Sequence, residues 1–159
     1  MVNKLKLPAL DPAEVPAVSG TNYPEPLKSR VAGRRKQRLG DALGLSIFGV
    51  NLTTIKPGAQ SALRHWHSAQ DEFVYMIEGE LVLVTGDGEQ VLAPGMCAGF
   101  PAGKADAHHL INRTTRDAVY LEVGDRTKRD AVTYPDDDIV AAATSDGARR
   151  FTRKNGTPY

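Results

Sequence analysis

Histidine and carboxylate side chains gather in one short stretch of the chain, where His65-Trp66-His67 is followed by Glu72. In an extended strand, residues i and i+2 point to the same side. His65 and His67 would therefore present two imidazoles to one space, and the short connection to Glu72 lets its carboxylate return to that space. Imidazole combined with carboxylate suits Zn, Mn, Fe, Ni or Co better than Ca or Mg. The spacing predicts a site for one divalent transition metal.

The two remaining histidines, His108 and His109, are adjacent and begin a second apolar stretch. A single histidine is most often an ordinary core or surface residue. Here, however, all four histidines of the chain fall in two tight pairs, each at an expected strand start. A buried histidine or carboxylate is costly unless it is paired or bound to a metal. We therefore expect one member of the second pair to join the first three residues around Zn, Fe, Mn or Ni.

The elements that must position these residues are short strands. A chain of 159 residues fits one globular domain with its own core, and its 15 glycines and 10 prolines are typical of strands joined by tight turns. Turn signals such as Lys56-Pro57-Gly58 and Glu78-Gly79 separate apolar stretches. We expect an all-β sandwich or barrel, with strands over Leu45–Ile55, Glu72–Ile77, Glu80–Thr85, Glu89–Leu92, His108–Asn112 and Ala118–Val123.

The charge balance gives little reason to expect a nucleic acid or membrane partner. The formal net charge is +1 and the sequence pI is about 7.9, and we interpret the basic run Arg30–Arg38 as a charged surface segment. No apolar stretch approaches the roughly 20 residues that cross a bilayer. With one cysteine, Cys97, expected to be a small buried thiol, and no signal-peptide pattern, a cytoplasmic protein is predicted.

Two motifs in the right order resemble those of the cupin superfamily. The first, G-x5-H-x-H-x(3,4)-E-x6-G, departs only by one extra residue in its first gap, and the second, G-x5-P-x-G-x2-H-x3-N, carries two extra residues before its histidine. The resemblance spans about residues 45 to 123 and implies a double-stranded β-helix, the jelly-roll barrel. The matching residues are Gly58, His65, His67, Glu72 and Gly79, then Gly95, Pro101, Gly103, His108 and Asn112.

The resemblance implies that the metal ligands are His65, His67, Glu72 and His108. The spacing to Asn112 favours His108 as the fourth ligand, because His108 and Asn112 then share one strand face. If His109 were the ligand, Arg113 would point toward the barrel instead. His109 stays the alternative.

The resemblance divides the chain into an N-terminal arm (1–44) that packs on the barrel or a partner subunit, the barrel (45–124), and a C-terminal extension (125–159). In the extension, a short helix is expected over Ile139–Ala143. The strands over Glu72–Ile77 and Glu80–Thr85 are apolar on both faces, so something must cover the outer face. A symmetric homodimer is the commonest way to cover it.

Several polar residues flank the motifs and are candidate substrate contacts. Arg64 and Lys104 could hold an anionic group at the barrel mouth, and Asn51 could point into the pocket; exposed loop charges and a strand-edge hydrogen bond are the ordinary alternatives. Asp106 is a candidate acid or base, or a polar turn residue.

These observations predict a metal-binding cupin that is a metal-dependent enzyme acting on a small polar or anionic molecule. The reaction would be of the dioxygenase, decarboxylase or sugar-phosphate isomerase type. The alternative is a non-catalytic binding or sensor cupin that holds a small-molecule ligand in the barrel. Prolines before residue 45 leave no room for a DNA-binding helix-turn-helix there.

Overall fold

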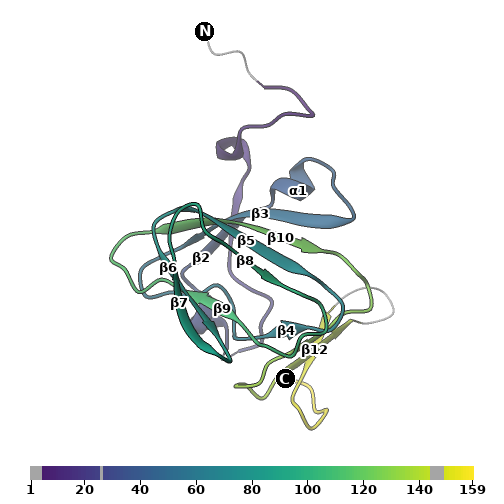
Figure 1. Cartoon of the computed structure of the whole chain (residues 1–159). Coiled ribbons are helices and arrows are strands. Elements are labelled where there is room, and N and C mark those ends of the chain that lie inside the picture. Colours follow the sequence, from purple (N-terminus) through teal and green to yellow (C-terminus); the bar gives the residue numbers. More distant parts are fainter. Residues whose placement is uncertain (1–4, 26, 144–148) are drawn as a thin grey trace.

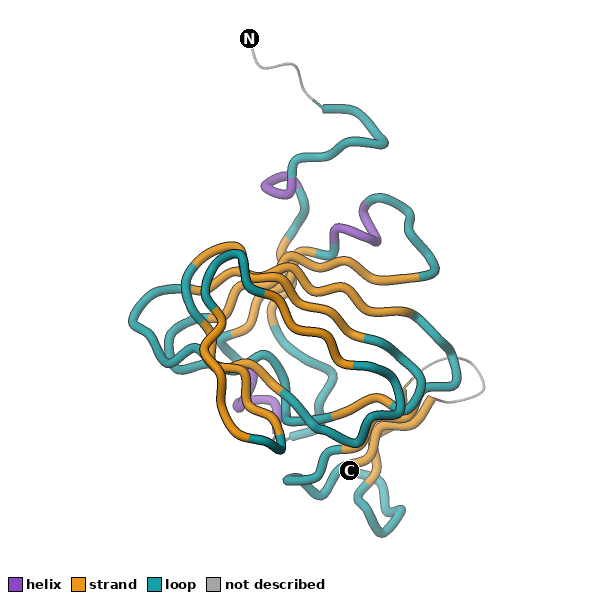
Figure 2. Tube along the Cα trace, viewed as in Figure 1, coloured by secondary structure: helices purple, strands orange, loops and turns teal. Residues whose placement is uncertain are grey.

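The computed structural model describes residues 5–25, 27–143 and 149–159, and strands dominate them (Figures 1 and 2). The helical elements are short: η1 (Pro12–Glu14), η2 (Leu27–Val31) and α1 (Leu39–Ala42). The strands are β1 (Ala17–Ser19), β2 (Arg34–Gln37), β3 (Phe48–Ile55), β4 (Trp66–His67), β5 (Glu72–Glu78), β6 (Leu81–Thr85), β7 (Gly88–Leu92), β8 (Cys97–Phe100), β9 (His109–Ile111), β10 (Ala118–Asp125), β11 (Ala131–Thr133), β12 (Val140–Ala143) and β13 (Arg149–Thr152).

Three antiparallel sheets form a jelly-roll barrel, and the predicted all-β fold class is confirmed. The largest sheet has the strand order β1-β2-β3-β10-β5-β8, and it lies across from a three-stranded sheet, β7-β6-β9 (Figure 1). A third sheet, β13-β12-β11-β4, closes one end. Neighbours in space are distant in sequence, as in a double-stranded β-helix. Among the described residues, no helix is long and apolar enough to cross a membrane.

Strand alternation in β5 decides what enters the barrel. Glu72, Val74 and Met76 face inward, whereas Phe73, Tyr75 and Ile77 are 40%, 42% and 48% exposed on the outer face. Because the side-chain period of a strand is two, the same backbone delivers one carboxylate and two core residues to the interior. At the end of β5, Gly79 has φ +71°, and a Cβ there would lie 2.7 Å from the carbonyl oxygen of Asp117. Only glycine fits this turn.

The main core lies between the six-stranded and three-stranded sheets. Inner-face residues of the larger sheet pack against the leucines of β6, β7 and the strand that follows His108. The cluster comprises Ile55, Val74, Met76, Leu81, Leu83, Leu92, Leu110, Ala118 and Tyr120. Burial of these side chains holds the two layers together.

Met76→Ala is expected to lower the free energy of unfolding by about 2–5 kcal/mol, because Met76 is fully buried in this core and truncation leaves a cavity. Urea denaturation measures the change. Met96→Ala is the matched control, since Met96 is 50% exposed, and it should cost no more than about 0.5 kcal/mol. Equal losses in the two variants would contradict this placement of the core.

A second core joins the two flanking segments of the chain. Tyr23 and Val31 come from the N-terminal segment, Leu63 comes from the loop before β4, and the rest come from the C-terminal segment: Val132, Tyr134, Ile139 and Ala141. β2 pairs with β3, and β11 pairs with β4. Both flanking segments therefore extend sheets of the barrel, although the boundaries at residues 44 and 124 stay predictions.

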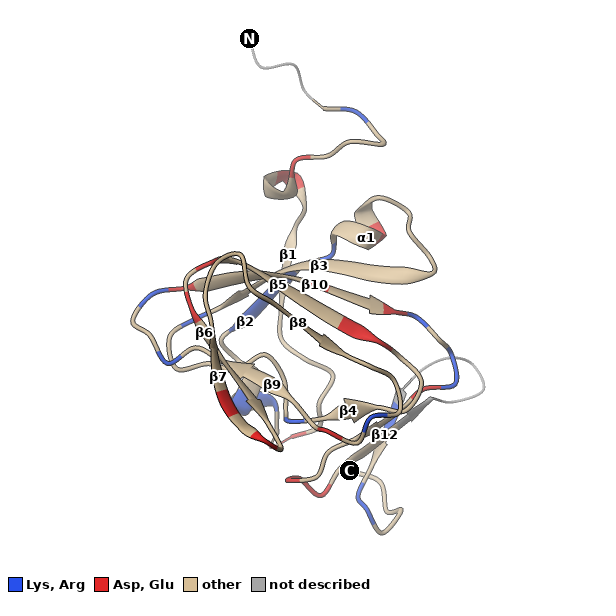
Figure 3. Ribbon diagram, in the orientation of Figure 1, with Lys and Arg blue, Asp and Glu red and all other residues tan. Residues whose placement is uncertain are grey.

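Three local predictions are wrong. The segment expected as a helix over Ile139–Ala143 contains strand β12, because Ile139 and Ala141 alternate into the second core and β12 pairs with both β11 and β13. Cys97 is exposed, since it lies opposite Tyr75 on the outer face. The basic run is not wholly a surface segment: β2, largely blue in Figure 3, alternates half-buried Arg34 and Lys36 with exposed Arg35.

Candidate metal centre

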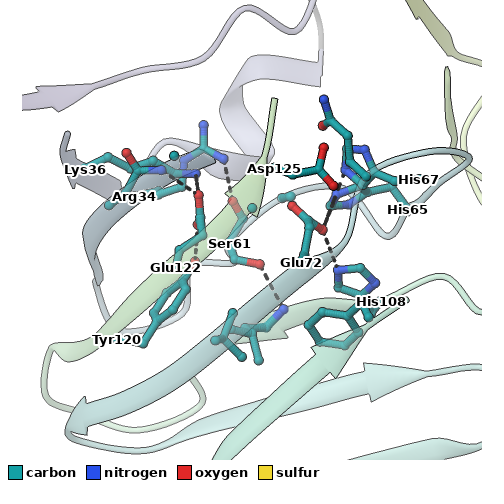
Figure 4. Close-up of a pocket in the computed structure, with 18 of the residues that line it drawn as sticks. Arg34, Lys36, Ser61, His65, His67, Glu72, His108, Tyr120, Glu122 and Asp125 are labelled. Carbon is teal, nitrogen blue, oxygen red and sulfur yellow. Dashed lines mark hydrogen bonds and ion pairs between the residues drawn. The ribbon is translucent and has the colours of Figure 1, made fainter. Parts of the chain in front are cut away.

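Four of the predicted site residues converge inside the barrel (Figure 4). His67 lies in β4, Glu72 begins β5, and His65 and His108 pair through an isolated bridge with backbone N···O distances of 3.1 and 2.9 Å. This bridge aligns the segment before β4 with the segment before β9. We call His65, His67, Glu72 and His108 the His/Glu cluster.

The cluster is arranged around one oxygen of Glu72. The Nε2 atoms of His65 and His67 each lie 3.6 Å from Glu72 Oε2, and His108 Nε2 lies 3.0 Å from it. Two ligand atoms about 2.1 Å from one ion are about 3.0 Å apart at right angles and about 3.4 Å apart at a tetrahedral angle. Ligand atoms of His65, His67 and Glu72 all lie within 4.8 Å of one another. These three donors therefore fit a transition metal, and His108 adds a fourth nitrogen beside Glu72.

Hydrogen bonds fix which nitrogen faces the centre in two of the three rings, those of His65 and His67. His65 Nδ1 is 2.7 Å from the carbonyl oxygen of Leu63, which can only accept, so Nδ1 carries the hydrogen and Nε2 keeps its lone pair. His67 Nδ1 likewise donates to Asp130 Oδ2 at 2.6 Å. Such an outer hydrogen bond orients a metal-binding imidazole and makes it more basic.

The charge states of the cluster also suit a metal. Burial alone would raise the pKa of Glu72, but its contacts with His108, His65 and His67 hold that pKa well below the usual range. Burial lowers the pKa of His108, and this effect outweighs the hydrogen bond to Glu72, which raises it. The group is thus an ionised carboxylate beside a neutral imidazole, which are the ligand forms that bind metals.

His109 lies outside the cluster. Its Nδ1 is 3.2 Å from the carbonyl oxygen of Ala62, and its ring is near Arg64 and Asp136. The structure therefore brings His108, and not His109, next to Glu72.

Two cavities meet at the cluster. The larger has a volume of about 400 Å³ and the smaller about 290 Å³, and both are lined by His67, Glu72, Phe100 and His108. The rings of Phe100 and His108 stack with centroids 3.5 Å apart and an interplanar angle of 2°. The stacked pair forms part of the wall of each cavity, so ligands can approach the cluster from two sides.

The predicted substrate contacts are distributed unevenly. Asn51 lines the larger cavity, and Lys104 and Asp106 line the smaller one. Arg64 lines neither cavity; it makes a two-point contact with Asp136, with nitrogen–oxygen distances of 2.6 and 2.8 Å. This pair also holds the pKa of Asp136 below its usual value.

A half-buried polar group on the wall of the larger cavity, centred on Glu122, was not predicted from the sequence. Glu122 Oε1 accepts hydrogen bonds from Lys36 Nζ at 2.6 Å and from Asn51 Nδ2 at 3.0 Å, and Tyr120 donates to Oε2 at 3.1 Å. Burial would raise the pKa of Glu122, but Lys36 lowers it below its ordinary value. Burial, together with Glu122, raises the pKa of Tyr120 well above 10. The signal for the part played by Lys36 was the strand period of two, which places Lys36 on the same face as Arg34 and opposite to exposed Arg35.

The C-terminal segment also contributes to the centre. Asp130 precedes β11, its side chain is 2% exposed, and besides His67 it accepts a hydrogen bond from the backbone N–H of Ala69 at 3.0 Å. The ring of Tyr134 stacks on His65 with centroids 5.7 Å apart. Both residues lie far from the histidine motif in sequence, so no local pattern could reveal them.

The structure is a β-barrel whose interior carries a group of histidines and a glutamate that could hold a metal ion. The family model for the cupin domain matches residues 51–124. A structure named a sugar phosphate isomerase from a cupin superfamily, from Silicibacter pomeroyi, is 46% identical, covers 96% of both chains and gives a TM-score of 0.91. The chain belongs to the cupin superfamily.

Two further structures extend the comparison. One, from Acidithiobacillus ferrooxidans and named a candidate sugar phosphate isomerase, is 32% identical over 79% of this chain and 80% of that chain, with a TM-score of 0.72. A polyketide cyclase from Streptomyces resistomycificus is 18% identical over 74% of this chain and 78% of that chain, with a TM-score of 0.61, and shares the fold alone. No curated protein matches the chain.

Proposed function

We propose that the protein is a metal-dependent isomerase that acts on a small phosphorylated sugar. The observation that carries this proposal is the His/Glu cluster on the wall of a cavity of about 400 Å³ that also holds buried polar groups. The names of the two structures from Silicibacter pomeroyi and Acidithiobacillus ferrooxidans support the choice of isomerisation over oxygenation or decarboxylation.

The proposed ligands of one divalent metal are His65, His67, Glu72 and His108. His108 is preferred to His109 because only His108 Nε2 lies beside Glu72, at 3.0 Å. A bound divalent ion supplies Lewis acidity toward a carbonyl or hydroxyl oxygen. Four protein ligands leave one or two positions for substrate around a five- or six-coordinate ion.

The remaining cavity residues would bind and orient the sugar. Interconversion of an aldose and a ketose moves one hydrogen between neighbouring carbons and one proton between their oxygens, so it consumes no other reagent. Glu122 is an ionised carboxylate on this wall, outside the proposed ligand set, that can accept a proton. The amide oxygen of Asn51, whose nitrogen donates to Glu122, is available to a sugar hydroxyl group.

The proposal is tested by incubating the metal-loaded protein with aldose and ketose phosphates of three to six carbons and following both isomers by NMR. At least one pair should interconvert, while the same sugars without phosphate should not. If none interconverts although metal analysis shows a loaded site, the isomerase proposal is wrong. Tight sugar phosphate binding without turnover would favour the second candidate, a non-catalytic binding or sensor cupin.

We also propose that the outer face of the large sheet forms a symmetric homodimer. Exposed apolar residues of β5 continue onto its neighbours, since Phe73 pairs with Val123, Tyr75 with Leu121, and Leu121 with Leu52. Contiguous apolar patches of this kind mark interaction sites. A second copy of the same chain is the commonest partner for such a face.

Replacing Tyr75 and Ile77 together by glutamate should convert the dimer into a monomer, because each dimer would then bury four unpaired carboxylates. Light scattering after size exclusion should show the mass falling toward the 17.2 kDa of one chain. Val91→Glu is the control, since Val91 is 53% exposed on the opposite, three-stranded sheet, and it should leave the mass unchanged. A monomeric unsubstituted protein would refute the proposed dimer.

A further inference from the structure

The larger cavity has a second polar end on the far side of the His/Glu cluster. Arg34 and Lys36 point into it from β2, and Figure 4 shows them grouped away from His65, His67 and His108. In the sheet, β2 is separated from β5, the strand of Glu72, by β3 and β10. We call Arg34 and Lys36 the basic end.

The side chain of Lys36 spans part of this separation. Its ammonium group reaches across β3 to Glu122 on β10, with an Nζ–Oε1 distance of 2.6 Å. Glu122 pairs with Val74, and Gly124 pairs with Glu72. Glu122 and Glu72 are therefore diagonal neighbours on adjacent strands, and their Cα atoms are about 7–8 Å apart across the sheet. A ligand a few bonds long can therefore contact both the cluster and the basic end.

Two glycines leave room beside Glu72, at the cluster end of the larger cavity. Gly124 lies opposite Glu72 on one side and opposite Gly49 on the other, and both glycines line the larger cavity. A Cβ at Gly124 would lie 3.7 Å from Cγ of Glu72, so a longer side chain there would occupy the room beside this carboxylate. Between this point and Lys36, which pairs with Thr53, the inner face carries the polar pair Asn51 and Glu122.

Arg34 brings a positive charge that the described part of the chain does not balance. Its Nη1 donates to the carbonyl oxygen of Ser61 at 2.5 Å, and its Nη2 donates to that of Gly20 at 3.3 Å. Among the described residues, no carboxylate lies within 4.0 Å of its guanidinium nitrogens, whereas Lys36 is paired with Glu122. Arg34, Lys36 and Glu122 together carry one net positive charge. Because this part of the cavity wall is half-buried, the charge favours binding of an anion.

Several hydrogen-bond donors at this end have no partner among the described residues. A guanidinium has five N–H donors and an ammonium three, and the two carbonyl contacts and one carboxylate contact use only part of them. The hydroxyl oxygen of Ser61 accepts from the backbone N–H of Leu110 at 2.9 Å, which leaves its own hydrogen to donate. A planar fork, an ammonium and a hydroxyl suit a group with three or more acceptor oxygens.

We infer that Arg34, together with Lys36 and Ser61, forms the subsite for the phosphate group of the substrate. Glu122 holds the ammonium group of Lys36 in place, and Asn51 in turn holds Glu122. The inference rests on the proposed function and deepens it. A sugar with a terminal phosphate would place its carbonyl end at the His/Glu cluster and its phosphate at the basic end. Discrimination against unphosphorylated sugars would then arise at Arg34.

The experiment measures binding of inorganic phosphate to the metal-loaded full chain by calorimetry. Arg34→Gln should weaken binding by about 10- to 100-fold, since it removes charge-assisted hydrogen bonds. Arg35→Gln is the matched control, because Arg35 is exposed on the other face of the same strand, and it should leave the affinity unchanged. Arg34→Lys keeps the positive charge but loses the planar guanidinium group, so its phosphate affinity should lie between those of Arg34→Gln and Arg35→Gln. Thermal unfolding verifies that each variant is folded.

His65→Ala separates phosphate at the basic end from phosphate on the metal. It should leave most of the phosphate affinity in place. If His65→Ala abolishes phosphate binding and Arg34→Gln does not, the phosphate binds at the metal and the inference is wrong. The inference also fails if the unsubstituted protein binds no phosphate, or if Arg34→Gln and Arg35→Gln behave alike.

The sugar phosphates of the isomerase assay distinguish this inference from the proposed function. Arg34→Gln should raise KM for the phosphorylated sugar about 10- to 100-fold. Turnover with an unchanged KM in Arg34→Gln would refute the subsite and leave the isomerase intact. Phosphate binding that depends on Arg34, without any turnover, would refute the isomerase and leave the subsite intact.

Discussion

His65→Ala is expected to leave the purified protein with less than a tenth of the metal bound by the unsubstituted chain. The variant removes one of the three imidazoles that face Glu72 Oε2. Loss of an outer hydrogen-bond partner of a ligand already costs about 10- to 100-fold in metal affinity, and loss of a ligand itself costs more. Elemental analysis of protein purified without added ions measures the effect, and isomerase activity should fall with the metal content.

His109→Ala provides the matched control for this experiment. It removes an imidazole at a neighbouring position whose ring contacts Ala62 outside the cluster. Its metal content should equal that of the unsubstituted chain. Full metal retention in His65→Ala, or loss in His109→Ala, would show that the proposed ligand set is wrong.

Asp130→Asn is expected to lower metal affinity by about 10- to 100-fold without removing any ligand. The carboxylate of Asp130 accepts the Nδ1 hydrogen of His67 at 2.6 Å and is almost fully buried. An amide of the same size keeps the packing but replaces the carboxylate that accepts the hydrogen of His67 Nδ1 with a weaker, neutral acceptor. Competition with a chelating metal indicator gives the dissociation constant directly.

Asp136→Asn is the control for Asp130→Asn. Asp136 belongs to the same C-terminal segment but pairs with Arg64 at the surface. Its substitution should leave metal affinity unchanged within about twofold. If Asp130→Asn lowers only the thermal stability of the metal-free protein, and metal affinity is retained, Asp130 is merely a structural residue.

The centre of the fold could be predicted because its signals are local. Alternation placed His65 and His67 on one side of β4 and separated Glu72 from Phe73 in β5. Tight turns at glycines separated β5 from β6, and the strands β3, β5, β6, β7, β9 and β10 overlap the predicted ones.

The surroundings of the site could not be predicted because they depend on pairing between distant strands. Asp130 reaches His67 across 63 residues through the pairing of β11 with β4. Lys36 reaches Glu122 across 86 residues because β2 joins β3 beside β10. The charge of the segment from Arg30 to Arg38 suggested that it lies at the surface. Only the pairing of β2 with β3 shows that Arg34 and Lys36 face the interior of the barrel.

The pairing of β4 with β11 limits how far the chain can be truncated in a fragment or a chimaera. The family match ends at residue 124, yet Asp130, which holds His67, and Tyr134, which stacks on His65, both follow that point. A fragment trimmed to the family boundary would keep every proposed ligand and lose two of the residues that orient them. A fragment that is meant to carry a complete site must therefore extend beyond residue 124. A chimaera built on this barrel must include the C-terminal segment with Asp130 and Tyr134.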